Sequence, residues 1–137
     1  MKIIGLDGKE YPWNYTKYKS IRLDCSSLHW RTRVMLNEMF PYDTIYEEVI
    51  IPGIKNEIAQ RALIADFYIN APKLMVEVQG EQHTKHVQFF HANKLEYFRA
   101  KKLDSLKRQW CIINKIKLVE LPCDGTDEEW ERKIRNI

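Results

Sequence analysis

Two apolar segments joined by a short turn, each carrying a single carboxylate, constrain the fold of this chain more than any other feature. The first is Leu63–Ile69, which contains Asp66, and the second is Met75–Gln79, which contains Glu77. The connection contains Asn, Ala and Pro, and consecutive strands with so short a connection pair antiparallel. A carboxylate inside a strand costs free energy unless it is paired or binds a cation. The two carboxylates therefore suggest a divalent-metal site.

The composition is that of a globular protein of one domain. The chain has 137 residues, of which 45% are apolar and 30% are charged, which excludes a disordered chain. No apolar run approaches the roughly 18 residues that cross a membrane, and the N-terminus lacks a signal peptide's apolar region. We therefore expect an intracellular protein without a membrane partner. Three cysteines without a C-x-x-C motif predict buried, reduced thiols at Cys25, Cys111 and Cys123.

Turn and capping signals divide the single domain, residues 1–137, into three parts. We expect a hairpin appendage over 1–20, a core over 24–121 and a C-terminal helix over 126–137. Apolar periodicity predicts the core elements in this order: a helix over 27–40, strands over 44–51, 59–69 and 73–80, a helix over 90–114 and a strand over 116–121. A strand reached through a long helix usually pairs parallel. The expected fold is α/β or α+β, with a mixed central sheet flanked by helices on both faces.

The spacing of the polar residues brings three of them together. Ten residues separate Asp66 from Glu77, which can place them side by side on hairpin strands. Gln79 lies two residues after Glu77, so its side chain points to the same face. Carboxylate oxygens bind Mg²⁺, which would polarise a phosphodiester and lower the pKa of an attacking water.

The pattern Asp66-x10-Glu77-x-Gln79, set in an α-β-β-β-α-β order, resembles the PD-(D/E)XK restriction-endonuclease-like nucleases. The stretches 78–83, 104–107 and 116–121 are more specifically similar to the small Vsr-like (very-short-patch-repair) and phage homing-type endonucleases. The resemblance covers about residues 24–121. It implies a restriction-endonuclease-like core and a Mg²⁺- or Mn²⁺-dependent DNA endonuclease, of a phage type that acts in nicking, homing, repair or junction resolution.

The resemblance also assigns roles to individual residues. Metal binding falls to Asp66, Glu77 and the backbone carbonyl of Val78. Gln79 stands where the family usually has Lys and lacks its positive charge, and the candidates to replace that lysine are Lys107 and Lys101 of the second core helix. The expected catalytic residues are Asp66, Glu77, Gln79, His83 and Lys107. The expected nucleic-acid contacts are His29, Lys85, His86, Lys94, Lys101 and Lys107. His29 is also the residue nearest to the position of a first-helix Glu that often joins the family's metal site.

The charge distribution is compatible with DNA as the partner. The net charge is only +3, but residues 94–117 are rich in Lys and Arg and contain two acids, Glu96 and Asp104. Such a segment can face a polyanion or can be an ordinary solvated helix face. Cleavage of both strands would imply a homodimer, because a domain of this size offers one site.

Three alternatives remain open from the sequence. The chain can be a nucleic-acid-binding module that keeps the nuclease fold without the chemistry, as the Gln79 substitution suggests. It can be a structural virion or interaction protein, in which case Asp66 and Glu77 need basic partners, and Arg61 is the nearest candidate on the preceding strand. A zinc site of His83, His86 and Glu77 has the required number of ligands but an unfamiliar spacing.

Overall fold

Four strands form one mixed sheet in the order β3-β4-β5-β6 in this computed structural model, which describes residues 1–19, 23–54, 63–79 and 90–137, with the side chains of the last range from residue 98. The strands are β3 (Ile45–Ile51), β4 (Leu63–Ile69), β5 (Leu74–Gln79) and β6 (Lys117–Pro122). The first three form the predicted antiparallel meander, and β6 runs parallel to β5 as expected. The expected mixed α and β architecture is confirmed.

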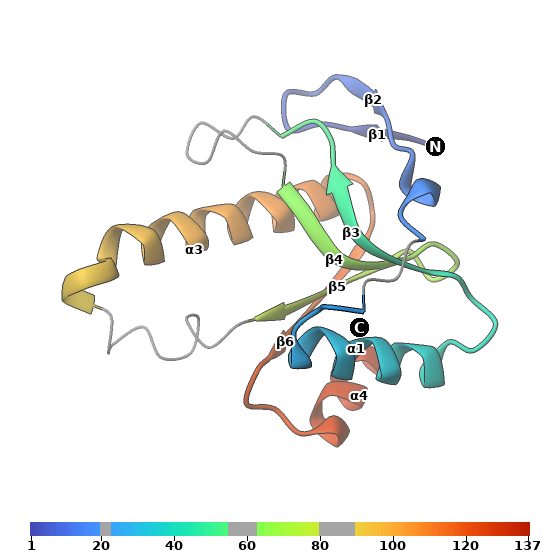
Figure 1. Cartoon of the computed structure of the whole chain (residues 1–137). Coiled ribbons are helices and arrows are strands. Elements are labelled where there is room, and N and C mark those ends of the chain that lie inside the picture. Colours follow the sequence, from blue (N-terminus) through green and yellow to red (C-terminus); the bar gives the residue numbers. More distant parts are fainter. Residues whose placement is uncertain (20–22, 55–62, 80–89) are drawn as a thin grey trace.

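Helices and a hairpin cover the two faces of the sheet (Figure 1). Helices α1 (Ser27–Met39) and α4 (Asp127–Arg135) pack on one face, which we call the α1/α4 face. Helix α3 (Phe90–Ile113) packs on the opposite face together with a hairpin made of β1 (Lys2–Ile4) and β2 (Glu10–Pro12), and we call this the α3 face. None of the described helices is both long enough and apolar enough to span a membrane.

Capping residues fix where α1 and α4 begin. The Ser26 hydroxyl accepts a hydrogen bond from the His29 amide at 3.2 Å, and α1 ends at Met39, just before Pro41. The Thr126 hydroxyl likewise accepts from the Glu129 amide at 3.2 Å and starts α4. Most of the described ends of these elements agree with the predicted ends or differ from them by one residue. Residues 59–62 and 80 of the predicted strands lie outside the described residues.

The N-terminal hairpin is part of the core and not an appendage. Ile3 and Trp13 are almost fully buried. The Trp13 indole packs against Tyr68 and Trp110 at centroid distances of 4.6 and 5.1 Å, and its N–H donates to the carbonyl of Ile50. Because these contacts join the hairpin to β3, β4 and α3, the aromatic residues serve packing. An unpredicted 3₁₀ helix, η1 (Tyr15–Lys17), follows the hairpin.

The cysteines differ in burial more than the composition suggested. Cys111 of α3 is buried in the core, whereas Cys25 and Cys123 are only partly buried, and all three are free thiols. The prediction of a buried thiol therefore holds for Cys111 alone. Burial raises the pKa of the Cys111 thiol to about 12, so this sulfur acts as a packing group.

Candidate functional site

Asp66 and Glu77 converge where β4 and β5 separate. The last paired residues of these strands are Phe67 and Val76, and the same register places Asp66 opposite Glu77 one position further on. The Asp66 amide donates to Glu77 Oε2 at 3.3 Å, and the Val78 amide donates to Asp66 Oδ2 at 2.9 Å. Each carboxylate thus binds the backbone of the other strand. The predicted convergence of the two carboxylates is confirmed.

A lysine from α3 reaches this pair. Lys107 Nζ lies 2.6 Å from Glu77 Oε1, and the two side chains are only 16% and 12% exposed. Lys107 and Lys101 are the two candidates from the sequence to replace the lysine missing at Gln79, and this contact brings the Lys107 ammonium group to Glu77, two residues before that position. It equally supplies the basic partner that a purely structural pair of acids would need. Arg61, the partner considered from the sequence, lies outside the described residues.

Burial controls the protonation of Glu77. Removal from water raises the pKa of its carboxyl to about 8, and the neighbouring Asp66 carboxylate acts in the same direction. The Lys107 ammonium favours the ionised form but does not offset the other two effects. Glu77 therefore gains a proton or a cation more readily than an exposed carboxylate does.

Gln79 is held by a second acid–base pair on the α3 face. Its amide nitrogen donates to Glu120 Oε2 at 3.3 Å, and Arg108 binds both oxygens of Glu120 at 2.9 and 2.8 Å. The parallel register of β5 and β6 places Glu77 beside Glu120. Asp66, Glu77 and Glu120 thus follow one another across three neighbouring strands.

His29 makes different contacts from those expected. Its Nε2 lies 2.6 Å from Glu47 Oε1, and its ring stacks on Phe67 at a centroid distance of 4.4 Å. Arg33 of α1 donates two hydrogen bonds to the same carboxylate, at 2.8 and 2.7 Å. Since His29 is mostly buried and bound to Glu47, the structure does not join it to Asp66 or Glu77 and gives no support to a DNA contact there.

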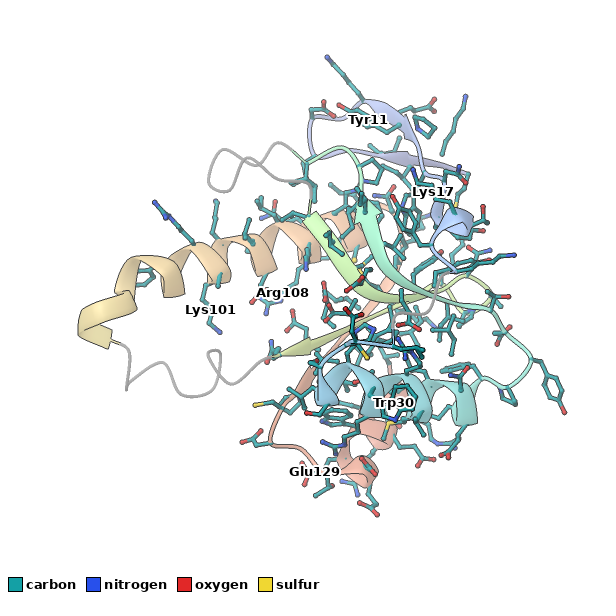
Figure 2. All side chains as sticks on the ribbon, viewed as in Figure 1. Tyr11, Lys17, Trp30, Lys101, Arg108 and Glu129 are labelled. Carbon is teal, nitrogen blue, oxygen red and sulfur yellow. The ribbon has the colours of Figure 1, made fainter. Side chains whose placement is uncertain are left out.

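The remaining predicted residues are only partly visible. His83, Lys85 and His86 lie outside the described residues, as does the zinc alternative built on the two histidines. Lys94 belongs to α3, but its side chain is not among those described. Lys101 and Arg108 project from the same side of α3 (Figure 2). In the part of the chain that the structure describes, no three His, Cys, Asp or Glu side chains gather as a metal-binding group.

Sequence reasoning missed the two acids that complete these contacts. Glu120 is the one carboxylate of β6, which is the same signal that identified Asp66 and Glu77, whereas Glu47 is followed directly by a second acid, Glu48, within the otherwise apolar β3. Their partners Arg33 and Arg108 lie on the helices that directly precede these strands, and the pairing depends on how each helix packs against the sheet.

The comparisons with known proteins yield two viral relatives. "Uncharacterized protein 094L" of frog virus 3 (isolate Goorha) is 35% identical over 91 residues, which cover 65% of this chain and 59% of the relative. "Uncharacterized protein 307L" of invertebrate iridescent virus 6 is 40% identical over 57 residues, which cover 42% of this chain and 29% of the relative. The chain thus spans less than two thirds of either relative.

Neither printed name states an activity, a ligand or a partner. No protein-family model matches the chain, and no solved structure matches it. The chain is therefore similar to two viral proteins whose names state no function. Its function is inferred from the geometry of its own side chains.

Proposed function

We propose that this chain is a metal-dependent DNA endonuclease with a restriction-endonuclease-like core. The observation that carries the proposal is the meeting of Asp66 and Glu77 at a strand fork, with Lys107 bound to Glu77. The element order α1-β3-β4-β5-α3-β6, in which β6 runs parallel to β5, is the order that the resemblance implies.

The residues at the fork fit a hard divalent cation. Asp66, Glu77 and the backbone carbonyl of Val78 would hold Mg²⁺ or Mn²⁺, because all three offer oxygen atoms. The contact of Glu77 with an ammonium group is an observation of this structure that favours positive charge at the same place. When bound, the ion would polarise a phosphodiester and lower the pKa of an attacking water.

The chain's own residues would do the remaining work. Lys107 carries the positive charge that Gln79 lacks, and it stands where it can approach a phosphate next to Glu77. Gln79, held by Glu120, would orient a water through its amide group. Lys101 and Arg108 on the same side of α3 would bind the DNA backbone, and such contacts set affinity rather than sequence preference.

The decisive experiment compares plasmid cleavage by the wild-type protein, Asp66→Asn and Asp124→Asn, each with Mg²⁺, Mn²⁺ or EDTA. Asn at position 66 can still accept the Val78 hydrogen bond, so the fold should survive while the charge is lost. Asp124 is exposed and distant, which makes it a charge-matched control. We expect cleavage by the wild type and by the control, and none by the Asp66 variant.

Two results would refute the nuclease. Equal cleavage by the wild type and the Asp66 variant would mean that a contaminant cleaves the plasmid. Salt-sensitive DNA binding by a wild-type protein that neither cleaves DNA nor binds Mn²⁺ in calorimetry would assign the chain to the nucleic-acid-binding alternative. In that case the contact of Lys107 with Glu77 would be a structural ion pair.

A further inference from the structure

The ladder between β3 and β4 is interrupted at one position. Glu47 pairs with Phe67 and Val49 pairs with Ala65, but Glu48 and Asp66, which lie opposite each other in between, do not pair. Glu48 has a φ angle of 51°, which is the left-handed region. Glycine enters this region freely and Asn does so more readily than other residues, whereas a glutamate is held there only by its surroundings.

Side chains change faces at this interruption. In a regular strand, residues two apart share a face. Phe67 packs on the α1/α4 face, whereas Ala65 packs on the α3 face. On the partner strand, Glu47 binds Arg33 of α1, whereas Val49 packs on the α3 face. The side chains of both strands therefore change faces at the position of Glu48 and Asp66.

The interruption has a direct consequence for the candidate site. Continuation of the β4–β5 register would pair Val78 with Ala65, but the paired residues end at Phe67 and Val76. The Val78 amide binds the Asp66 carboxylate in place of a β4 carbonyl, and the Asp66 amide turns to Glu77. Asp66 can make both contacts because it has left the ladder with β3.

We propose that Glu48 is a positioning residue whose left-handed backbone keeps Asp66 out of the β3–β4 ladder, so that the Asp66 carboxylate reaches Val78 and meets Glu77. The neighbouring Glu47 fixes the interruption in place, because His29 and Arg33 of α1 hold its carboxylate. The consequence for metal affinity rests on the proposed function, whereas the consequence for the strands does not.

The test replaces Glu48 with residues of graded tolerance for a left-handed backbone. Glu48→Gly and Glu48→Asn keep the conformation accessible and remove the carboxylate, so they control for the lost charge. Glu48→Val strongly disfavours the conformation and favours a straight strand. Three quantities are measured: hydrogen exchange of the Val78 amide, cross-strand NOEs between residue 48 and Asp66, and Mn²⁺ affinity by calorimetry.

We expect the Gly and Asn variants to match the wild type in all three measurements. The Val variant should gain the cross-strand NOEs, and its Val78 amide should exchange about tenfold faster or more, as expected when a hydrogen bond to a charged group is lost. Its Mn²⁺ affinity should fall by about the same factor. If the Val variant does not fold, Glu48→Ala provides the same comparison with a smaller effect.

Each result has one meaning for the proposal. Unchanged Val78 exchange in a folded Val variant overturns it, and so does faster exchange in the Gly variant, because the side chain and not the backbone would then act. If the wild type binds no Mn²⁺ but Val78 exchange still depends on residue 48, the positioning role stands and the nuclease proposal fails.

Discussion

The buried carboxyl of Glu77 should make the stability of the protein fall as the pH rises. Its pKa is about 8 in the folded chain, against 4.5 for the unperturbed group. A group whose pKa is higher in the folded state contributes stability that is fully present below the lower value and is lost as the pH rises through the upper one. The window for this effect therefore runs from pH 4.5 to about pH 8.

The magnitude follows from proton linkage. Within the window, the free energy of unfolding changes by about 1.4 kcal/mol per pH unit for one group. From about pH 5 to about pH 7.5 the loss should amount to roughly 3 kcal/mol. The Glu77 side chain is only 12% exposed, so solvent screens this effect little.

The assay compares urea unfolding of the wild type and Glu77→Gln at several pH values in EDTA, followed by tryptophan fluorescence. Gln keeps the shape of the side chain but does not titrate, so the difference between the two stabilities should shift by the stated amount across the window. The substitution also leaves Lys107 without its carboxylate partner, which adds a constant difference between the two free energies of unfolding. The test uses only the change of this difference with pH, so the constant part has no influence on it. In Asp66→Asn the window should end at a lower pH, because Asp66 contributes to the raised pKa. Parallel curves for the wild type and Glu77→Gln would refute the reasoning.

Three further predictions concern the same framework. If the fork binds Mn²⁺, the affinity measured by calorimetry should rise by up to about tenfold per pH unit below pH 8, because binding displaces the Glu77 proton; a pH-independent affinity would show that Glu77 is not a ligand. Glu47→Ala should lower the free energy of unfolding by about 3–5 kcal/mol in urea titrations, since it removes the buried carboxylate partner of Arg33, whereas the exposed control Glu128→Ala should change it little. Thr126→Ala should cost about 1 kcal/mol through the lost N-cap of α4, with circular dichroism reporting the helix; an unchanged stability would mean that the cap contributes nothing.

The sequence predicted those features that depend on local signals. The turn between β4 and β5 sets the register of the hairpin, and this register brings Asp66 opposite Glu77. Ser26 and Thr126 mark helix starts through hydrogen bonds to amides three residues later, which a sequence pattern can reveal. The order of elements was predictable from apolar periodicity, and the parallel pairing of β6 was predictable from the long helix that precedes it.

The features that were not predicted depend on contacts between distant parts of the chain. Nothing in the sequence marks Glu48 as a left-handed residue, because turn signals of this kind come from Gly and Asn. The sequence predicts an appendage for the N-terminal hairpin, because only the fold brings Trp13 against Trp110. The contacts of Arg33 with Glu47 and of Arg108 with Glu120 likewise join elements whose relative positions the sequence does not specify.

The charges on the α3 face connect the stability prediction with the proposed function. Asp66, Glu77 and Glu120 follow one another across β4, β5 and β6, and the adjacent Lys107 and Arg108 neutralise the second and the third. Asp66 accepts a backbone hydrogen bond instead, so among the described residues these three carboxylates are matched by two bases. A proton on Glu77 restores the balance, and a bound cation would do the same. Because proton and cation would compete for one carboxylate, Mn²⁺ should weaken the pH dependence of the wild type and leave that of Glu77→Gln unchanged.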